Sequence, residues 1–336
     1  MRAKKIAFIV CDSGLGHLIR SLKIAAEIIK LNTNVFFFCN KKKLKNIKFQ
    51  KNNSLKFINF ISGHNKQLND QNYFYKIEKK IPTLKQFDIV ISDNLPEVLK
   101  KHKNVVLISN FFWHRIISKF KNYRNIEKIL KQKKPLILCN KYVSHPYINK
   151  YENVKKLGFF TDYIKKTLKK SRVLLVSEGT SHTKTSDKFY LLKYIEIVGP
   201  FFDKIFLDPK YFNDKKFYKF IKKINSSVFL AKYNNQMFTL VSHAIIKPGL
   251  GLVTDCVSNN ISCYYFYKNF NKEFIYNAKK LENFKIGKIL NIKNIINLKK
   301  ELKQIKIKHK NYSTLKWSAH KQAAKIIINK NKINER

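Results

Sequence analysis

The sequence predicts an α/β protein made of two doubly wound parallel-sheet domains. Apolar strand-like runs alternate with helix-sized gaps, and this pattern is interrupted once by a polar stretch before it restarts. The length of 336 residues also fits two domains of average size. We expect an N-terminal domain over residues 1–165, a C-terminal domain over 171–310, and a final helix within 311–336 that can pack back on the N-terminal domain.

The first half opens with a strand, a glycine turn and a helix. Residues 6–11 are continuously apolar, which is typical of a strand buried on both faces. The turn Asp-Ser-Gly-Leu-Gly follows, and from His17 to Ile29 apolar residues recur at helical spacing. Further strands are expected over residues 35–39, 87–93, 105–109 and 135–139.

The second half repeats this architecture without repeating the sequence. The polar stretch 163–171 has the composition of an interdomain linker. Strands are then expected over residues 172–177, 195–200, 228–230, 244–249 and 262–267, and a helix over 313–329. Ligands of such sheets bind beyond the carboxyl ends of the strands, so the loops at those ends are where we look for chemistry.

The composition is strongly basic, with 69 Lys+Arg against 21 Asp+Glu and a formal net charge of +48. Only six of the basic residues are Arg, whose forked guanidinium is the preferred group for base and phosphate recognition. The abundance of Lys, Asn, Ile, Phe and Tyr matches A/T-rich codon usage. A specific nucleic-acid partner is therefore not expected. Peripheral contact with an anionic membrane surface is retained as an alternative origin of the charge.

The five cysteines are scattered, with no C-x-x-C pair and no histidine cluster at zinc spacing, so neither a metal nor a cofactor is expected. The first apolar stretch is short and stops at Asp12, unlike a signal peptide, and no run approaches the ~20 apolar residues that span a bilayer. A cytoplasmic protein is expected, with the inner face of the membrane as a peripheral location.

The first candidate site is the motif Ser-Gly-Leu-Gly-His-Leu-Ile-Arg at residues 13–20. Gly14 and Gly16 permit a tight turn at a strand end, and the helix that follows offers free N–H groups to an anion or a sugar. His17, at the start of that helix, can act as a base near neutral pH. The third glycine of a dinucleotide-binding loop is missing. A plain turn with a capping histidine is the alternative.

Two weaker motifs lie in the second half. In Lys-Pro-Gly-Leu-Gly-Leu-Val-Thr-Asp, residues 247–255, a glycine loop again precedes a helix start, and Asp255 lies about one turn into the helix, where its carboxylate can accept two ribose hydroxyls. Residues 271–287 are amphipathic, end near a glycine and include Glu273 and Asn277. Taken separately, both motifs could be ordinary helix starts and faces.

Taken together and in this order, the three motifs resemble the GT-B superfamily of nucleotide-sugar enzymes. The opening Gly-x-Gly-His-x-x-Arg is similar to that of the lipid-linked N-acetylglucosaminyltransferase of peptidoglycan synthesis and of the UDP-sugar hydrolase of pseudaminic acid synthesis. The resemblance is strongest over residues 5–30 and 226–290. It implies two Rossmann-like domains facing across a cleft and a metal-independent, inverting transfer of a sugar from a nucleotide sugar, with a UDP-sugar as the expected donor, to a glycan or lipid-linked acceptor.

The resemblance also implies roles for individual residues. His17 would be the catalytic base, and Asp255 would hold the ribose. The other donor-side residues would be Gly14, Gly16, Thr180, Ser181, Gly249, Leu250, Gly251, Glu273 and Asn277, and the acceptor-side residues Arg20, Asp93, Asn110 and His114. The chain departs from the family in the Glu-Gly-Thr-Ser loop after Ser177, where a double glycine is usual.

Two other functions stay open at this point. A UDP-sugar hydrolase of the pseudaminic-acid type would release UDP with water alone. A non-enzymatic, lysine-rich binder of polyanions or membrane surfaces would show salt-dependent association and no UDP binding. For the acceptor-side residues, Asp93 could instead cap its strand, and His114 could be a satisfied core histidine.

Overall fold

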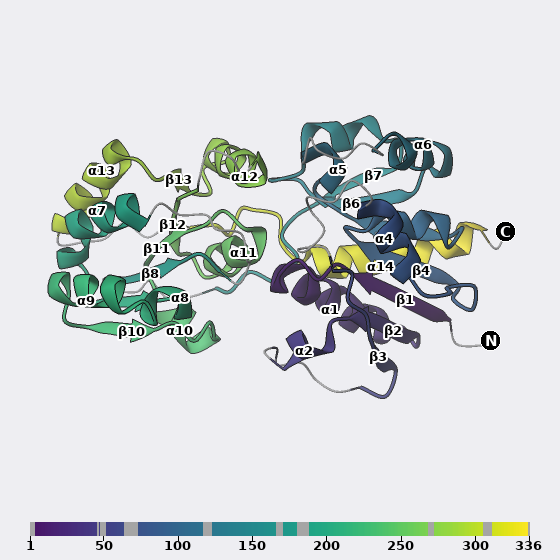
Figure 1. Cartoon of the computed structure of the whole chain (residues 1–336), viewed down its shortest axis with the longest axis horizontal. Coiled ribbons are helices and arrows are strands. Elements are labelled where there is room, and N and C mark those ends of the chain that lie inside the picture. Colours follow the sequence, from purple (N-terminus) through teal and green to yellow (C-terminus); the bar gives the residue numbers. More distant parts are fainter. Residues whose placement is uncertain are drawn as a thin grey trace. The chain divides into compact units, whose positions relative to one another are not determined.

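The computed structural model describes residues 4–45, 47, 52–63, 73–116, 123–165, 171–179, 188–267, 272–304 and 311–334. The chain divides into two compact units, one of Met1–Thr161 with Lys316–Arg336 and the other of Asp162–Leu315. Each unit is a parallel β-sheet flanked by helices (Figure 1). The predicted α/β class with two parallel sheets is confirmed.

The sheet of the first unit contains seven parallel strands among the described residues. They are β1 (Lys5–Val10), β2 (Asn34–Cys39), β3 (Leu55–Asn59), β4 (Ile89–Asp93), β5 (Val105–Ile108), β6 (Leu136–Asn140) and β7 (Val154–Leu157). Their order is β3-β2-β1-β4-β5-β6-β7, so the direction of winding reverses between β1 and β4. Ligands of open α/β sheets bind at such a switch point. The register pairs Val10 with Asp93 at this position.

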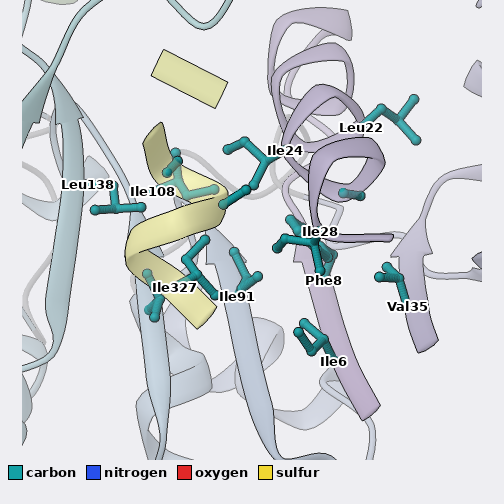
Figure 2. Packing of buried hydrophobic residues seen from close by; sticks show 14 of the residues in the cluster. Ile6, Phe8, Leu22, Ile24, Ile28, Val35, Ile91, Ile108, Leu138 and Ile327 are labelled. Carbon is teal, nitrogen blue, oxygen red and sulfur yellow. The ribbon is translucent and has the colours of Figure 1, made fainter. Parts of the chain in front are cut away.

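Helix α1 (Leu15–Ile29) and the C-terminal helix α14 (Ala319–Asn334) pack on the same face of this sheet. Figure 2 shows Ile24 and Ile28 of α1 and Ile327 of α14 in one buried cluster with Phe8 and Ile91 of the strands. The burial of these apolar side chains ties the two ends of the chain to one sheet. The first unit's other helical segments are α2 (Lys41–Leu44), α4 (Tyr73–Lys80), η1 (Pro96–Lys100), α5 (Trp113–Ile116), α6 (Tyr123–Lys133) and η2 (Pro146–Lys150).

The sheet of the second unit contains six parallel strands among the described residues. They are β8 (Val173–Ser177), β9 (Lys204–Leu207), β10 (Val228–Leu230), β11 (His243–Ile246), β12 (Ser262–Tyr265) and β13 (Lys288–Ile289). Their order is β10-β9-β8-β11-β12-β13, which places the switch point between β8 and β11. The register pairs Ile246 with Ser177 there.

The helices of the second unit form two layers. Helices α7 (Lys188–Val198), α9 (Lys215–Ile224) and α13 (Ile292–Lys303) bury apolar side chains in one cluster on one face of the sheet. Helices α10 (Asn235–Leu240), α11 (Leu250–Ser258) and α12 (Lys272–Asn283) belong to connections that run the opposite way along the sheet. Because such crossovers are right-handed, these three helices cover the other face. The short elements η3 (Gly199–Phe201) and α8 (Pro209–Phe212) lie in the connections after α7 and β9.

One predicted strand of the second unit is wrong. Residues 195–200 end helix α7 and form η3, and the strand comes later, as β9. Leu191, Ile195 and Val198 are buried at helical spacing, whereas the short run Ile-Glu-Ile-Val also matches the alternation of a strand. Four strands were not predicted at all, namely β3, β7, β9 and β13, and all are short and lie in the outer parts of the sheets.

Candidate functional site

The first unit holds a histidine–carboxylate pair at its switch point. His17 is the third residue of α1, which follows β1, and Asp93 is the last residue of the neighbouring β4. The His17 Nδ1 lies 2.7 Å from Asp93 Oδ1. A carboxylate can only accept this hydrogen bond, so Nδ1 carries the proton and Nε2 is left as the basic atom. The sequence predicted both residues as site residues but not that they pair.

Arg20 and Ser21, one turn further along α1, complete the environment of Asp93. Arg20 Nε donates to Asp93 Oδ2 at 3.0 Å and Ser21 Oγ donates to the same oxygen at 2.8 Å. Arg20 also forms a second hydrogen bond, to Asp93 Oδ1, at 2.5 Å. Burial alone would raise the pKa of Asp93, but Arg20 and His17 lower it to about 2. The carboxylate is therefore ionised at neutral pH, and Arg20, predicted on the acceptor side, holds it in place.

The turn between β1 and α1 has the geometry that the glycine motif predicts. Gly14 has φ 95° and its N–H donates to the Asp12 carbonyl at 2.9 Å. A Cβ atom on Gly14 would meet no atom within 4 Å, so the backbone conformation, not packing, requires glycine here. Gly16 lies in the first turn of α1. The Asp12 carboxylate accepts hydrogen bonds from the hydroxyl of Ser62 and from the Gly63 N–H, which fixes the turn from a neighbouring loop.

Two other predicted acceptor-side residues are engaged inside the first unit. Asn110 is buried, and its Oδ1 accepts a hydrogen bond from the Asn140 N–H at 2.7 Å, linking the ends of β5 and β6. His114 has a fully buried side chain whose Nε2 lies 2.7 Å from Glu127 Oε1. Burial lowers the pKa of His114 despite this carboxylate. These contacts tie Asn110 to β6 and His114 to α6, within the first unit.

In the second unit, the loop between β11 and α11 carries the second glycine motif. Gly249 is the N-cap of α11, and its N–H donates to the Lys247 carbonyl at 2.8 Å. The N–H groups of Leu250 and Gly251 belong to the first turn of the helix, where amides lack partners within the helix itself. Asp255 is half-buried in the same helix. The predicted helix start and glycine loop are therefore present, but the Gly249 N–H is used within the loop, so only Leu250 and Gly251 of the three predicted residues have amides in the first turn of the helix.

Helix α12 supports this loop. Asn277 is buried and its Nδ2 donates to the Pro248 carbonyl at 3.1 Å. Glu273, in the first turn of α12, interacts electrostatically with Lys247. Of the predicted donor-side residues, Thr180 and Ser181 lie outside the described residues.

Lys247 is a feature that the sequence analysis missed. It follows β11 directly, is only 4% exposed, and its Nζ lies 5.1 Å from the centre of the Phe274 ring. Burial lowers the pKa of Lys247 to about 8, although Glu273 and Glu178 favour its charged form. A single lysine among 63 carries no sequence signal, and only its burial beside the glycine loop distinguishes it.

The loop after β8 contributes a buried carboxylate to the edge of the second sheet. Glu178 is 2% exposed, and its Oε1 accepts a hydrogen bond from the Tyr211 hydroxyl at 2.6 Å. Its other oxygen accepts from Lys210. The Glu178 N–H in turn donates to Asp208 at 2.8 Å. The carboxyl edge of the second sheet is thus lined by charged groups of both signs.

No group of His, Cys, Asp and Glu side chains in the described part of the chain is placed to hold a metal ion. Within the same residues, no helix combines the length and the apolar character needed to cross a membrane.

No protein-family model matches the chain, and no curated protein matches its sequence. Solved structures do match over nearly the whole length. The glycosyltransferase of kitacinnamycin has a TM-score of 0.62 at 13% identity, covering 98% of this chain and 100% of the other. LpCGTa in complex with UDP has a TM-score of 0.60 at 10% identity, covering 98% and 94%. UGT89C1 of Arabidopsis thaliana, complexed with quercetin, has a TM-score of 0.61 at 8% identity, covering 97% and 100%.

The chain has a GT-B fold. At these identities the likeness concerns the fold, and function has to be argued from the site itself. In this GT-B chain the first unit supplies the His17–Asp93 pair, and the second supplies the glycine loop with Lys247 and Asn277. Both constellations lie at the switch point of their own sheet, where α/β folds bind ligands.

Proposed function

We propose that the protein is a glycosyltransferase that moves a sugar from a nucleotide sugar, a UDP-sugar in our reading, to a hydroxyl acceptor. The observation that carries the proposal is the hydrogen bond from His17 to the buried Asp93, which leaves a basic nitrogen at the edge of the first sheet. The GT-B fold also supports sugar transfer, since the solved structures that match this chain include a glycosyltransferase and a complex with UDP.

In the proposed mechanism, His17 Nε2 takes the proton of the attacking hydroxyl while the bond from the anomeric carbon to the diphosphate breaks. Asp93 holds the ring in the required tautomer and stabilises the imidazolium that forms. The hydroxyl oxygen becomes bonded to the anomeric carbon, and the nucleoside diphosphate leaves with the bonding electron pair. A single displacement of this kind inverts the anomeric configuration.

The second unit is proposed to bind the donor and its leaving group. The amides of Leu250 and Gly251 and the positive end of the α11 dipole favour a diphosphate. Lys247 adds a charged group next to this loop, and Asn277 keeps the loop in place. Asp255 is proposed to accept hydrogen bonds from the ribose, and Glu273 to face the donor sugar. Preorganised donors of this kind stabilise developing negative charge without a metal.

The acceptor is proposed to be a glycan or a lipid-linked sugar, with the chain cytoplasmic and peripheral to the membrane. The same His17–Asp93 pair can also activate water, so hydrolysis of the UDP-sugar is the second candidate. The two differ in one observable. A hydrolase releases UDP at its full rate in the absence of any acceptor, whereas a transferase releases UDP faster when its acceptor is present.

The test begins with calorimetric titration of UDP, followed by a screen of UDP-sugars for UDP release with and without acceptors. In His17→Ala, we expect UDP affinity to persist while turnover falls by ~10²–10⁴-fold, because only proton transfer is removed. His102→Ala is a matched control, since His102 contacts backbone carbonyls of Phe87 and Asn104 away from the pair. Failure of the wild-type chain to bind UDP would reject the donor, and unchanged turnover in His17→Ala would reject the base.

A further inference from the structure

The lysines of the second unit are distributed unevenly between its two helix layers. In one layer, α7 carries two lysines, α9 five and α13 four. The acidic residues within these three helices are Glu196 and Glu301. The layer of α10, α11 and α12 carries Lys272, Lys279 and Lys280, balanced by Asp255, Glu273 and Glu282. A compositional bias would load both layers alike, so bias alone does not account for the basic layer.

The lysines of the basic layer are mostly exposed and form a continuous surface. In α9, the buried Phe217 and Ile221 face the core, whereas Lys215, Lys219 and Lys223 are exposed. Figure 1 shows α13, α7 and α9 side by side, in agreement with the contacts of α7 with both neighbours. Of the acidic groups at this surface, Asp214 at the start of α9 is paired with Lys188.

The same layer carries the most exposed large apolar side chains among the described residues. Phe189 and Tyr190 in the first turn of α7 are 60% and 58% exposed, and Ile292 at the start of α13 is 55% exposed. The two helices run parallel, because Lys299 of α13 lies 5.7 Å from the ring of Phe201, just beyond the end of α7. Their first turns therefore lie at the same end of the layer, next to the exposed lysines.

We propose that this surface, formed by the outer faces of α7, α9 and α13, docks the protein on an anionic lipid bilayer. The lysines would neutralise lipid headgroups, and Phe189, Tyr190 and Ile292 would enter the headgroup region. The lysine ammonium groups suit the charged outer part of a membrane interface, and the aromatic and aliphatic side chains beside them suit its more apolar inner part. The inference is independent of the proposed enzymatic activity.

A membrane explains this surface better than a nucleic acid does. None of the three helices contains an arginine, whereas nucleic-acid surfaces favour its bidentate guanidinium. An exposed isoleucine such as Ile292 contributes nothing to the recognition of nucleic-acid phosphates, but its burial in the headgroup region of a bilayer is favourable. The Nζ of Lys193 is 4.5 Å from the centre of the Phe189 ring, so a cationic group and an exposed apolar group lie next to each other on this surface.

The test is co-sedimentation of the full chain with phosphatidylcholine vesicles, alone or with about a quarter phosphatidylglycerol. Binding is expected only to the anionic vesicles. Lys219→Glu/Lys223→Glu should weaken it by about tenfold or more, because each lysine near an anionic surface contributes appreciably. Phe189→Ser/Tyr190→Ser should weaken vesicle binding while leaving binding to a single-stranded oligonucleotide unchanged.

Controls on the opposite layer use matched chemistry. Lys279→Glu/Lys280→Glu in α12 and Leu240→Ser/Phe284→Ser, at exposed apolar positions, should leave vesicle binding within about twofold of the wild type. Equal losses in these variants would overturn the proposal, because binding would then follow net charge alone. If the chain bound the oligonucleotide more tightly than the vesicles, and Lys219→Glu/Lys223→Glu abolished that binding, the surface would be a nucleic-acid surface instead. UDP titration of each variant keeps this outcome separate from the proposed activity.

Discussion

The carboxylate of Asp93 lies 2.7 Å from the Nδ1 of His17, although 76 residues separate them in the chain. The contact depends on the parallel pairing of β1 with β4, which aligns Val10 with Asp93 and brings the start of α1 over the end of β4. Asp93 is fully buried, and Arg20 and Ser21 occupy its other acceptor positions. The ring of His17 is therefore held by a carboxylate that is itself fixed.

Asp93→Asn is expected to reduce turnover by ~10²–10⁴-fold, because an amide can stabilise the wrong tautomer of His17 and cannot stabilise the imidazolium. UDP affinity should change little, since Asp93 belongs to the other unit. Asp88→Asn, which removes an exposed carboxylate at the amino end of β4, is the control. Steady-state rates of UDP release measure the effect. Equal turnover in Asp93→Asn and the wild type would contradict the role of the pair.

Lys247→Met is expected to weaken UDP binding about tenfold at pH 7, because a charge-assisted contact is lost. In the wild type, burial lowers the pKa of Lys247 to about 8. The ammonium is present below this value, so affinity should fall as pH rises through 8. Glu178, Glu273, Asp208 and Lys210 are the charged groups around it.

The measurement is UDP titration between pH 6 and pH 9.5, with Lys247→Arg as the control that stays charged throughout. Lys247→Met should show a flat profile over the alkaline part of this range, and Lys247→Arg a flat profile at higher affinity. A wild-type profile that does not bend near pH 8 would remove Lys247 from the donor site.

Glu97→Gln is expected to remove a pH dependence of stability. Burial raises the pKa of Glu97 to about 8, and its Oε2 has no hydrogen-bond partner among the described residues. The folded chain therefore keeps a proton that the unfolded chain releases above its ordinary pKa of about 4.5. Stability contributed at this site falls as pH rises from about 4.5 to about 8, and is constant above that.

Thermal unfolding of the wild type and Glu97→Gln at several pH values between 5 and 8 measures the difference. The variant should gain stability over the wild type as pH rises. Glu152→Gln, at an exposed ion pair with Lys134, should follow the wild type. Parallel curves for all three proteins would mean that Glu97 is ionised in the folded state.

Gly14→Ala is expected to destabilise the first unit by about 1 kcal/mol, because φ 95° is unfavourable for a residue with a Cβ atom. The Cβ would meet no neighbour, so the effect measures backbone strain alone. Gly249→Ala is the comparison, since Gly249 has an ordinary φ of −79°. Thermal unfolding should show a loss in Gly14→Ala that exceeds any change in Gly249→Ala.

Much of the fold could be predicted from local patterns. The run at residues 6–11, its glycine turn and the helix after it are all present as β1, Gly14 and α1, because a doubly buried strand and an amphipathic helix leave clear periodicities. The strands β3, β7, β9 and β13 could not be predicted, since each contains lysine and is partly exposed, and none forms a continuous apolar run over its whole length. Residues 195–200 were assigned to a strand because a short apolar run fits both periods.

The candidate site shows the same division. The sequence by itself determined that glycine turns and the helix start with His17 follow buried strands, because a turn such as that at Gly14 needs a special backbone conformation and leaves a local signature. Only the tertiary structure decided that Asp93 orients His17, that His114 belongs to Glu127, and that Lys247 is buried while most other lysines are exposed. These relationships join distant residues through strand register and burial, which no local pattern encodes.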